Sequence, residues 1–191
     1  MRPATSLHTG DQGFALIVAL LAMVLMMALG MALVLTTMTE NRIASGYREG
    51  AAALYAADAA IERVLRDLLI APDVTRILDG TVASPFTDGP AGGVRVVPGG
   101  GTVDLTEATD LVRDENPLWQ LYAYGAVGRS YAAVWVAPAP GEPGGGTLAL
   151  LAHAYGPGGV RRAIEVTAAR SAVDVMPPTV RVLSWREQRE P

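Results

Sequence analysis

The sequence contains no cysteine and no lysine, and it has only two histidines, His8 and His153. The absence of cysteine excludes a disulfide scaffold, thiol catalysis and zinc sites with cysteine ligands. The net charge is −4 and the pI is near 5.1, so the chain lacks the basic surplus with which proteins displace counterions from nucleic acids. We therefore expect no nucleic-acid partner.

Motifs for catalysis or for cofactor binding are also missing. No Gly-x-Ser-x-Gly sequence occurs, and the glycine clusters lack the Lys-Ser/Thr of a phosphate-binding loop. His153 lies among apolar residues, which favours a core histidine over a metal ligand. We interpret Asp110, Asp114 and Glu115 as part of a solvated loop. The sequence therefore predicts a protein that is not an enzyme and that holds no metal and no cofactor.

Charge is absent from a long apolar run near the N-terminus. Residues 14–35 carry no charged side chain. As a helix with a rise of about 1.5 Å per residue, this run can cross a hydrocarbon core of roughly 30 Å. The run is longer than the apolar core of a cleaved secretory signal, usually about 7–15 residues, so it favours a retained, single membrane helix. The short polar leader and the large remainder favour a C-terminal part outside the cytoplasm.

The same helix is predicted to continue well beyond the membrane. No proline occurs between residues 14 and 71, and Pro72 is a natural stop. Residues 36–71 are mostly good helix formers, with apolar or small residues spaced alternately by four and three. This stripe consists of Ile43, Tyr47, Gly50, Leu54, Ala57, Ile61, Val64 and Leu68. We expect Tyr47, Leu54, Ile61 and Leu68 to pack the amphipathic half of the helix against the rest of the chain.

The remainder of the chain reads as β structure. Residues 72–117 are rich in proline and glycine and are interpreted as a loop region, with possible short strands at 94–97 and 102–105. Residues 118–185 contain strand patterns separated by glycine-rich turns, which predicts an antiparallel meander as the head. These strands are expected at 118–124, 131–137, 147–155, 160–169 and 180–185. Residues 186–191 are expected to form a frayed tail. The predicted fold class is α+β, a long helix packed on a C-terminal sheet.

Three motifs occur in order on the predicted helix. The first is Gly-Phe-Ala-Leu-Ile-Val-Ala-Leu-Leu at 13–21, the second Thr-Glu-Asn-Arg-Ile-Ala-Ser-Gly at 39–46, and the third Tyr-Ala-Ala-Asp-Ala-Ala-Ile-Glu at 55–62. Over about residues 10–70 the chain resembles the type IV prepilins, in particular the PilX-type minor pilins. It is more distantly similar to the minor pseudopilins of type II secretion.

The resemblance implies a pathway of processing and assembly. Residues 1–13 would be a leader that prepilin peptidase removes by cutting between Gly13 and Phe14, and the new N-terminus at Phe14 would be methylated. The helix of 14–35 would anchor the chain in the inner membrane, with the head in the periplasm. With the help of the inner-membrane assembly platform, it would then pack with other pilin subunits in the core of a pilus or pseudopilus.

Two positions depart from the pattern of the resembled family. Major pilins mostly carry glutamate at the fifth mature position, where this chain has Val18, and Gln12 stands where a basic residue is usual. Val18 argues for a minor pilin that primes assembly or sits near the filament tip. The alternatives are a minor pseudopilin of a type II secretion system and an unprocessed, signal-anchored envelope protein whose head binds a partner. The mature N-terminus separates a processed pilin from an unprocessed anchor.

Overall fold

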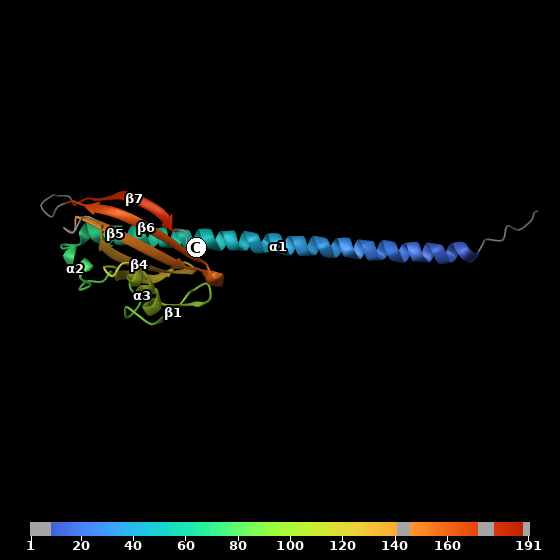
Figure 1. Cartoon of the computed structure of the whole chain (residues 1–191), viewed down its shortest axis with the longest axis horizontal. Coiled ribbons are helices and arrows are strands. Elements are labelled where there is room, and N and C mark those ends of the chain that lie inside the picture. The colour runs from blue at the N-terminus through green and yellow to red at the C-terminus, as the bar shows by residue number, and fades with distance from the viewer. Residues whose placement is uncertain (1–8, 141–145, 172–177, 189–191) are drawn as a thin grey trace, which may run out of the picture. The chain divides into compact units, whose positions relative to one another are not determined.

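The computed structural model describes residues 9–140, 146–171 and 178–188. The chain divides into two units, residues 1–45 and residues 46–191, which we call the N-terminal unit and the C-terminal unit and describe separately. Helix α1, Thr9–Ile70, begins in the first unit and ends in the second (Figure 1). It ends two residues before Pro72, which cannot continue the hydrogen-bond pattern of a helix.

The N-terminal unit is helical throughout its described part, residues 9–45. The helix already includes residues 9–13, which the sequence assigns to the leader. Just after the apolar run, the hydroxyl groups of Thr36, Thr37 and Thr39 each donate a hydrogen bond of 3.0 Å to the carbonyl oxygen four residues earlier. These bonds satisfy the three hydroxyl groups within the helix itself. The threonine side chains can therefore lie next to an apolar environment at little cost in free energy.

The C-terminal unit is built on one antiparallel sheet in the order β3-β4-β5-β6-β7, as the meander pattern predicted. Its strands are β3 Gln120–Val127, β4 Ser130–Pro138, β5 Thr147–Tyr155, β6 Arg161–Arg170 and β7 Val180–Gln188. A short 3-10 helix, η1 Pro157–Gly159, lies in the connection from β5 to β6. The α+β fold class is confirmed: the helix packs against this sheet.

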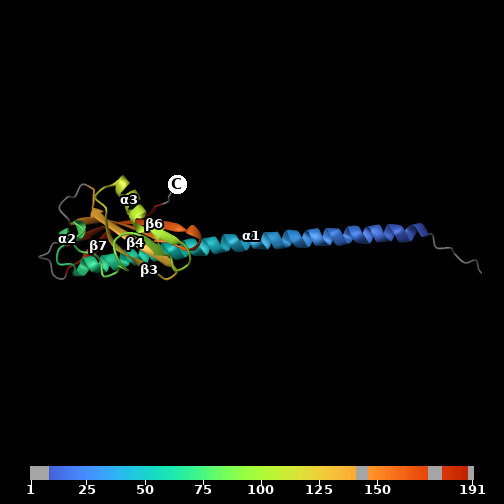
Figure 2. The same ribbon diagram turned by 90° about the horizontal axis from the view of Figure 1, so that it is seen from below.

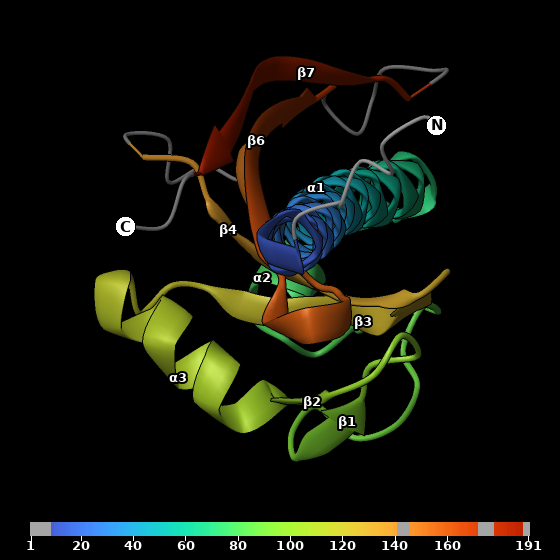
Figure 3. The same cartoon turned by 90° about the vertical axis from the view of Figure 1, so that its right-hand side faces the viewer.

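One face of the sheet packs on the part of α1 that belongs to the C-terminal unit. The first part of the helix contact consists of alanines, such as Ala53, Ala57 and Ala60, and larger side chains follow from Ile61 onward; the sheet contributes residues such as Val134 and Leu150. Because alanine leaves room beside the helix backbone, the strands approach it closely, and Figure 3 shows the sheet curving around α1. The helix and sheet thereby form the larger of two hydrophobic clusters in the described chain.

The buried face of α1 differs from the predicted stripe. Ile61 and Leu68 are fully buried against the sheet, and Leu54 is only partly buried at the margin of this cluster. The expected packing of Tyr47 is wrong, because its side chain is 80% exposed. Within this cluster, the buried residues of α1 start at Ala53. At this N-terminal end of the contact, alanines face the sheet and the larger residues beside them do not.

The opposite face of the sheet is covered by parts of the 72–117 region, for which the sequence predicts loops with possible short strands at 94–97 and 102–105. The two short strands are confirmed and pair as a hairpin. Helices α2 Thr75–Leu78 and α3 Leu105–Glu115 and the hairpin of β1 Val94–Val96 with β2 Thr102–Asp104 all fall in the 72–117 region. Of these, α3 and the hairpin lie on the far side of the sheet from α1 (Figure 3). They close a second cluster around Trp135 and Tyr131. Strands β4 and β5 are therefore buried on both faces.

Helix α3 corrects the loop interpretation of 72–117, and it has clear local causes. The side chain of Asp104 caps its N-terminus by accepting hydrogen bonds from the backbone N–H groups of Thr106, at 2.9 Å, and Glu107, at 3.4 Å. Its buried side chains are Leu105, Ala108, Thr109 and Val112, a helical spacing. The many prolines and glycines of the surrounding region concealed this short signal.

The predicted tail is also partly wrong, because β7 continues to Gln188. Arg186 and Gln188 both donate hydrogen bonds of 2.6 Å to the Glu165 carboxylate on β6, which fixes the end of β7 to its neighbour. Residues 189–191, the rest of the predicted tail, lie outside the described residues.

Candidate functional site: the apolar helix and its N-terminal junction

The predicted cleavage junction lies within a regular helical stretch. A Cβ atom placed on Gly13 would meet no other atom within 4 Å, and Gly13 does not have a positive φ angle. The fold of the chain therefore gives no reason for glycine at this position. By contrast, a Cβ atom on Gly50 would lie 2.8 Å from the guanidinium group of Arg162. A glycine without an internal role is favoured where another molecule must approach the backbone closely.

The surface that follows the junction is apolar and exposed. Every side chain from residue 13 to residue 44 is exposed within the structure, and the large apolar ones among residues 14–38 are 48–75% exposed. Among the described residues, α1 alone is long and apolar enough to cross a membrane. An apolar surface of this extent on all sides of a helix requires lipid or other helices around it. The helix is therefore an interaction surface along its whole apolar length.

His153 has a structural role in the second hydrophobic cluster. Its ring contacts the Trp135 indole edge-on, with 4.9 Å between ring centroids, and its Nδ1 lies 2.8 Å from Nη2 of Arg161. Burial, and to a lesser degree the charge of Arg161, lowers the pKa of His153 to about 3. The neutral ring can therefore accept a hydrogen bond from Arg161. Among residues the structure describes, no group of three or more His, Asp or Glu side chains could hold a metal ion.

This burial makes stability depend on pH. Unfolding returns His153 to its ordinary pKa of 6.5, so below that pH the unfolded chain binds a proton that the folded chain excludes. As the pH is lowered from roughly 6 to 4, protonation of His153 in the unfolded chain should reduce the free energy of unfolding by about 1 kcal/mol for each pH unit. Denaturant titrations of wild type and His153→Gln at several pH values measure the difference. Equal slopes for the two proteins would contradict the expectation.

The acidic residues interpreted as a loop lie elsewhere than expected. Asp110, Asp114 and Glu115 are exposed side chains of helix α3. Their exposure agrees with solvated groups, but their position on a helix corrects the loop assignment.

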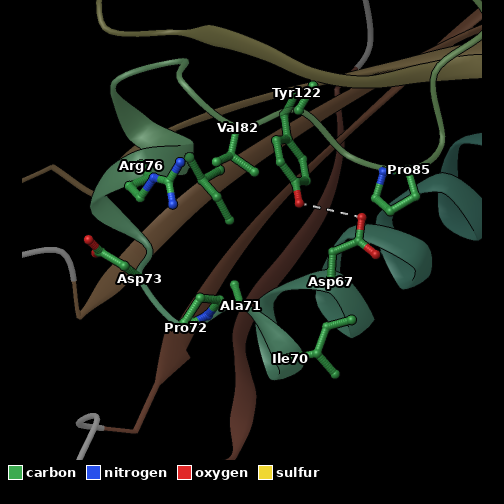
Figure 4. Close-up of a pocket in the computed structure, with 11 residues that line it drawn as sticks. Asp67, Ile70, Ala71, Pro72, Asp73, Arg76, Val82, Pro85 and Tyr122 are labelled. Atoms are coloured by element: carbon green, nitrogen blue, oxygen red, sulfur yellow. Dashed lines mark hydrogen bonds between the residues drawn. The ribbon is translucent and has the colours of Figure 1, made fainter.

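Helix α2 lies near the end of α1 (Figure 2), and a pocket of about 240 Å³ lies there (Figure 4). The Asp67 carboxylate accepts hydrogen bonds from the hydroxyl groups of Ser84 and, at 3.5 Å, Tyr122. Burial and the nearby Asp67 raise the pKa of the Tyr122 hydroxyl, which keeps it a donor. The pocket is smaller than typical small-molecule sites, and these bonds join α1 to β3 and to the segment before it. We interpret the cluster as structural.

One comparison with known protein families covers both the predicted junction and the helix that follows it. Residues 12–62 match the family model described as PilX N-terminal. The N-terminal region of this chain is PilX-like. The match begins one residue before Gly13 and ends inside α1, so it includes the junction, the whole apolar run and the first part of the helix that packs on the sheet. The resemblance to PilX-type minor pilins is confirmed for this region.

The match does not extend to the rest of the chain. It stops before α2 and includes no strand of the C-terminal unit. No curated protein and no solved structure matches the chain. The comparisons thus relate residues 12–62 to the PilX N-terminal family, and α1 is long and apolar enough to cross a membrane. What the C-terminal unit contacts has to be argued from its own surface.

Proposed function

We propose that this protein is a minor pilin of a type IV pilus, which primes assembly or sits near the filament tip. The observation that carries the proposal is the position of the PilX-like match, which starts at the junction and follows a fully exposed apolar helix. A helix that is apolar on all sides is stable in lipid and equally in a bundle of similar helices. This property supports transfer of the helix from the inner membrane into a filament core.

Processing by prepilin peptidase is the second part of the proposal. The enzyme would remove residues 1–13 and methylate the amino group of Phe14. The open space around Gly13 supports this role, because a residue without a side chain lets an enzyme at the membrane surface reach the scissile backbone. After cleavage, the apolar run would begin at the first residue of the mature chain.

Val18 supports a minor position in the filament. A carboxylate in a packed apolar core costs several kcal/mol unless it is paired. In the resembled major pilins, a glutamate at this place is compensated by the N-terminal amine of a neighbouring subunit. A chain with Val18 offers no such pairing, so its register against that neighbour is less specified. This suits a rare, terminal or priming subunit, which needs only one side of the usual contact.

The proposal includes the location and the partners. The chain would insert in the inner membrane with one span and with the C-terminal unit in the periplasm. The assembly platform of the inner membrane would then extract it, and other pilin subunits would pack along residues 14–35. The C-terminal unit would remain outside the filament core, available for contacts of its own.

An unprocessed membrane anchor is the second candidate, and two features favour it. The helix continues from Thr9 through the junction, and Gln12 replaces the usual basic residue before the scissile glycine. A peptidase would have to act on this helical stretch or unwind it. The mature N-terminus distinguishes the two candidates, since an anchor would keep residues 1–13.

We expect sheared and purified filaments to contain this chain in processed form and in small amount. Intact-mass spectrometry should find a chain that starts at N-methylated Phe14. Quantitative mass spectrometry should find far fewer copies of it than of the major subunit, and its deletion should lower filament number more than filament length. A chain that keeps residues 1–13 in cells with prepilin peptidase would refute processing. Near-equal amounts of the two subunits would refute the minor assignment.

A further inference from the structure

The two edges of the five-stranded sheet differ in how they are protected. Edge strand β3 is covered by residues 84–87: the N–H of Ser84 donates to the carbonyl oxygen of Tyr122 at 3.0 Å, and the N–H of Tyr124 donates to that of Phe86 at 2.9 Å. Thr87 pairs with Tyr124 as a parallel bridge. The backbone groups in the middle of this edge are therefore occupied.

Edge strand β7 has no such cover within the described chain. It is nine residues long, and β6 is its sole strand neighbour in the sheet. Three of its apolar side chains, Val182, Leu183 and Trp185, are 46–49% exposed. A long edge with free backbone groups and exposed apolar side chains is a template for another strand, and proteins usually blunt such edges unless they use them.

The second half of β7 is regular and held in place. Thr167 pairs with Ser184 and Ala168 with Val182, so Leu183 is the extra residue of a bulge, and residues 184–188 follow without interruption. On the face toward α1, the indole N–H of Trp185 donates to Asp58 at 3.3 Å. On the other face, Arg186 and Gln188 bind Glu165. An edge fixed from both faces loses little entropy when a further strand pairs with it.

The same end of the sheet is basic in a chain of net charge −4. Strands β6 and β7 contain five arginines and two glutamates: Arg161, Arg162, Arg170, Arg181, Arg186, Glu165 and Glu187. Both glutamates already have an arginine partner, Arg186 for Glu165 at 2.6 Å and Arg162 for Glu187 at 3.8 Å. Arg181, on β7 itself, is exposed and forms no ion pair with any described residue. Charge complementarity therefore favours an acidic partner.

We propose that β7 accepts an extended, acidic segment of another protein as a sixth strand of the sheet. Backbone hydrogen bonds to the free edge would supply affinity, and Trp185 and Arg181 would select the side chains of the incoming strand. A second copy of this chain suits the edge less well, because β7 carries two arginines against one glutamate, so pairing β7 with β7 adds no acidic surplus, and residues 84–87 cover β3. The inference rests on the C-terminal unit alone, so its test and the test of the minor-pilin proposal can fail independently of each other.

Photo-crosslinking in the native membrane tests the proposal on the full chain. A photoreactive residue is placed in turn at Val182 and Ser184, which lie on β7 on either side of the bulge and take no part in the contacts with Glu165 and Asp58. Strand pairing predicts that both positions attach to one partner peptide, at points about two residues apart, and that this peptide contains acidic residues. The matched control is Leu118, which is 56% exposed but does not lie on β7; it should give no adduct with that peptide.

The other outcomes overturn the proposal. Absence of adducts, adducts scattered over many proteins, adducts with lipid, or adducts with β7 of a second copy would each show that no acidic strand occupies this edge. Two substitutions sharpen the test in chains that keep the wild-type melting temperature. Leu183→Glu, which places an acidic side chain on the edge, and Arg181→Glu should each lower the adduct yield several-fold, whereas Arg129→Glu, outside the sheet edge, should not. An unchanged yield in folded Arg181→Glu would refute the acidic partner.

Discussion

Truncation of Leu68 to alanine is expected to lower the free energy of unfolding by about 2–5 kcal/mol. Leu68 is 0% exposed and lies in the cluster between α1 and the sheet. Its loss leaves a cavity that the surrounding strands cannot fill, because they are hydrogen-bonded to one another. Since domains are stable by only about 5–15 kcal/mol in total, this single change should unfold a large fraction of the C-terminal unit on mild heating.

Substitutions of two other leucines serve as comparisons for Leu68→Ala. Leu111 also lies on a helix, α3, but is 51% exposed, so Leu111→Ala should change stability by about 0.5 kcal/mol or less. Leu54, partly buried at the margin of the same cluster as Leu68, should fall between the two. Denaturant unfolding of the full chain in detergent, followed by circular dichroism, measures all three variants. Similar losses for Leu68→Ala and Leu111→Ala would show that the helix face does not pack on the sheet in solution.

Gly13→Leu is expected to abolish removal of the leader and to leave the precursor in the membrane. A leucine side chain at this point would separate the scissile backbone from an approaching peptidase. The substitution should leave the chain otherwise intact, because a Cβ atom at position 13 meets no atom within 4 Å and the surrounding helix surface is exposed. Intact-mass spectrometry of the membrane fraction distinguishes the precursor from the mature chain.

Gly46→Leu is the matched control for this substitution. A Cβ atom at position 46 also meets no atom within 4 Å, and it lies on the same helix, far along the chain from the junction. Gly46→Leu should therefore be processed like wild type. If Gly13→Leu is cut at the wild-type rate, the glycine has no part in processing, and the assignment of the junction is wrong.

Local patterns of the sequence determined most secondary structure. The charge-free run and the absence of proline up to residue 71 predict one long helix, and α1 ends at Ile70. The glycine-rich turns and the strand patterns between them predict the antiparallel meander, and β5 has the predicted bounds, Thr147–Tyr155. These features depend on residues close together in the chain, whose backbone preferences act before any distant contact forms.

The short helix α3 and the choice of the buried face of α1 depended on residues far apart in the sequence. Helix α3 is a weak signal in a proline-rich region, and it is stabilised by its Asp104 cap and by burial against the sheet. The predicted stripe on α1 included Leu54 and not Ala53, whereas in the structure Ala53 is buried against the sheet and Leu54 lies at the margin, because the close approach of the strands leaves room for the smaller residue. Tyr47 has the spacing of a core residue but is exposed. Helical periodicity indicates a face, whereas the partner determines which residues of that face are covered.

The two interaction surfaces, the apolar helix and the edge strand β7, also differ in whether the sequence alone indicates them. The sequence by itself indicates the apolar helix and its PilX-like motifs and predicts the junction at Gly13 and Phe14, because these depend on composition and order along one helix. Only the tertiary structure decided that residues 84–87 cover one edge of the sheet and that β7 is open within the described chain. An edge is defined by the strand that is missing beside it. That depends on how distant segments pair, which no local pattern in the sequence records.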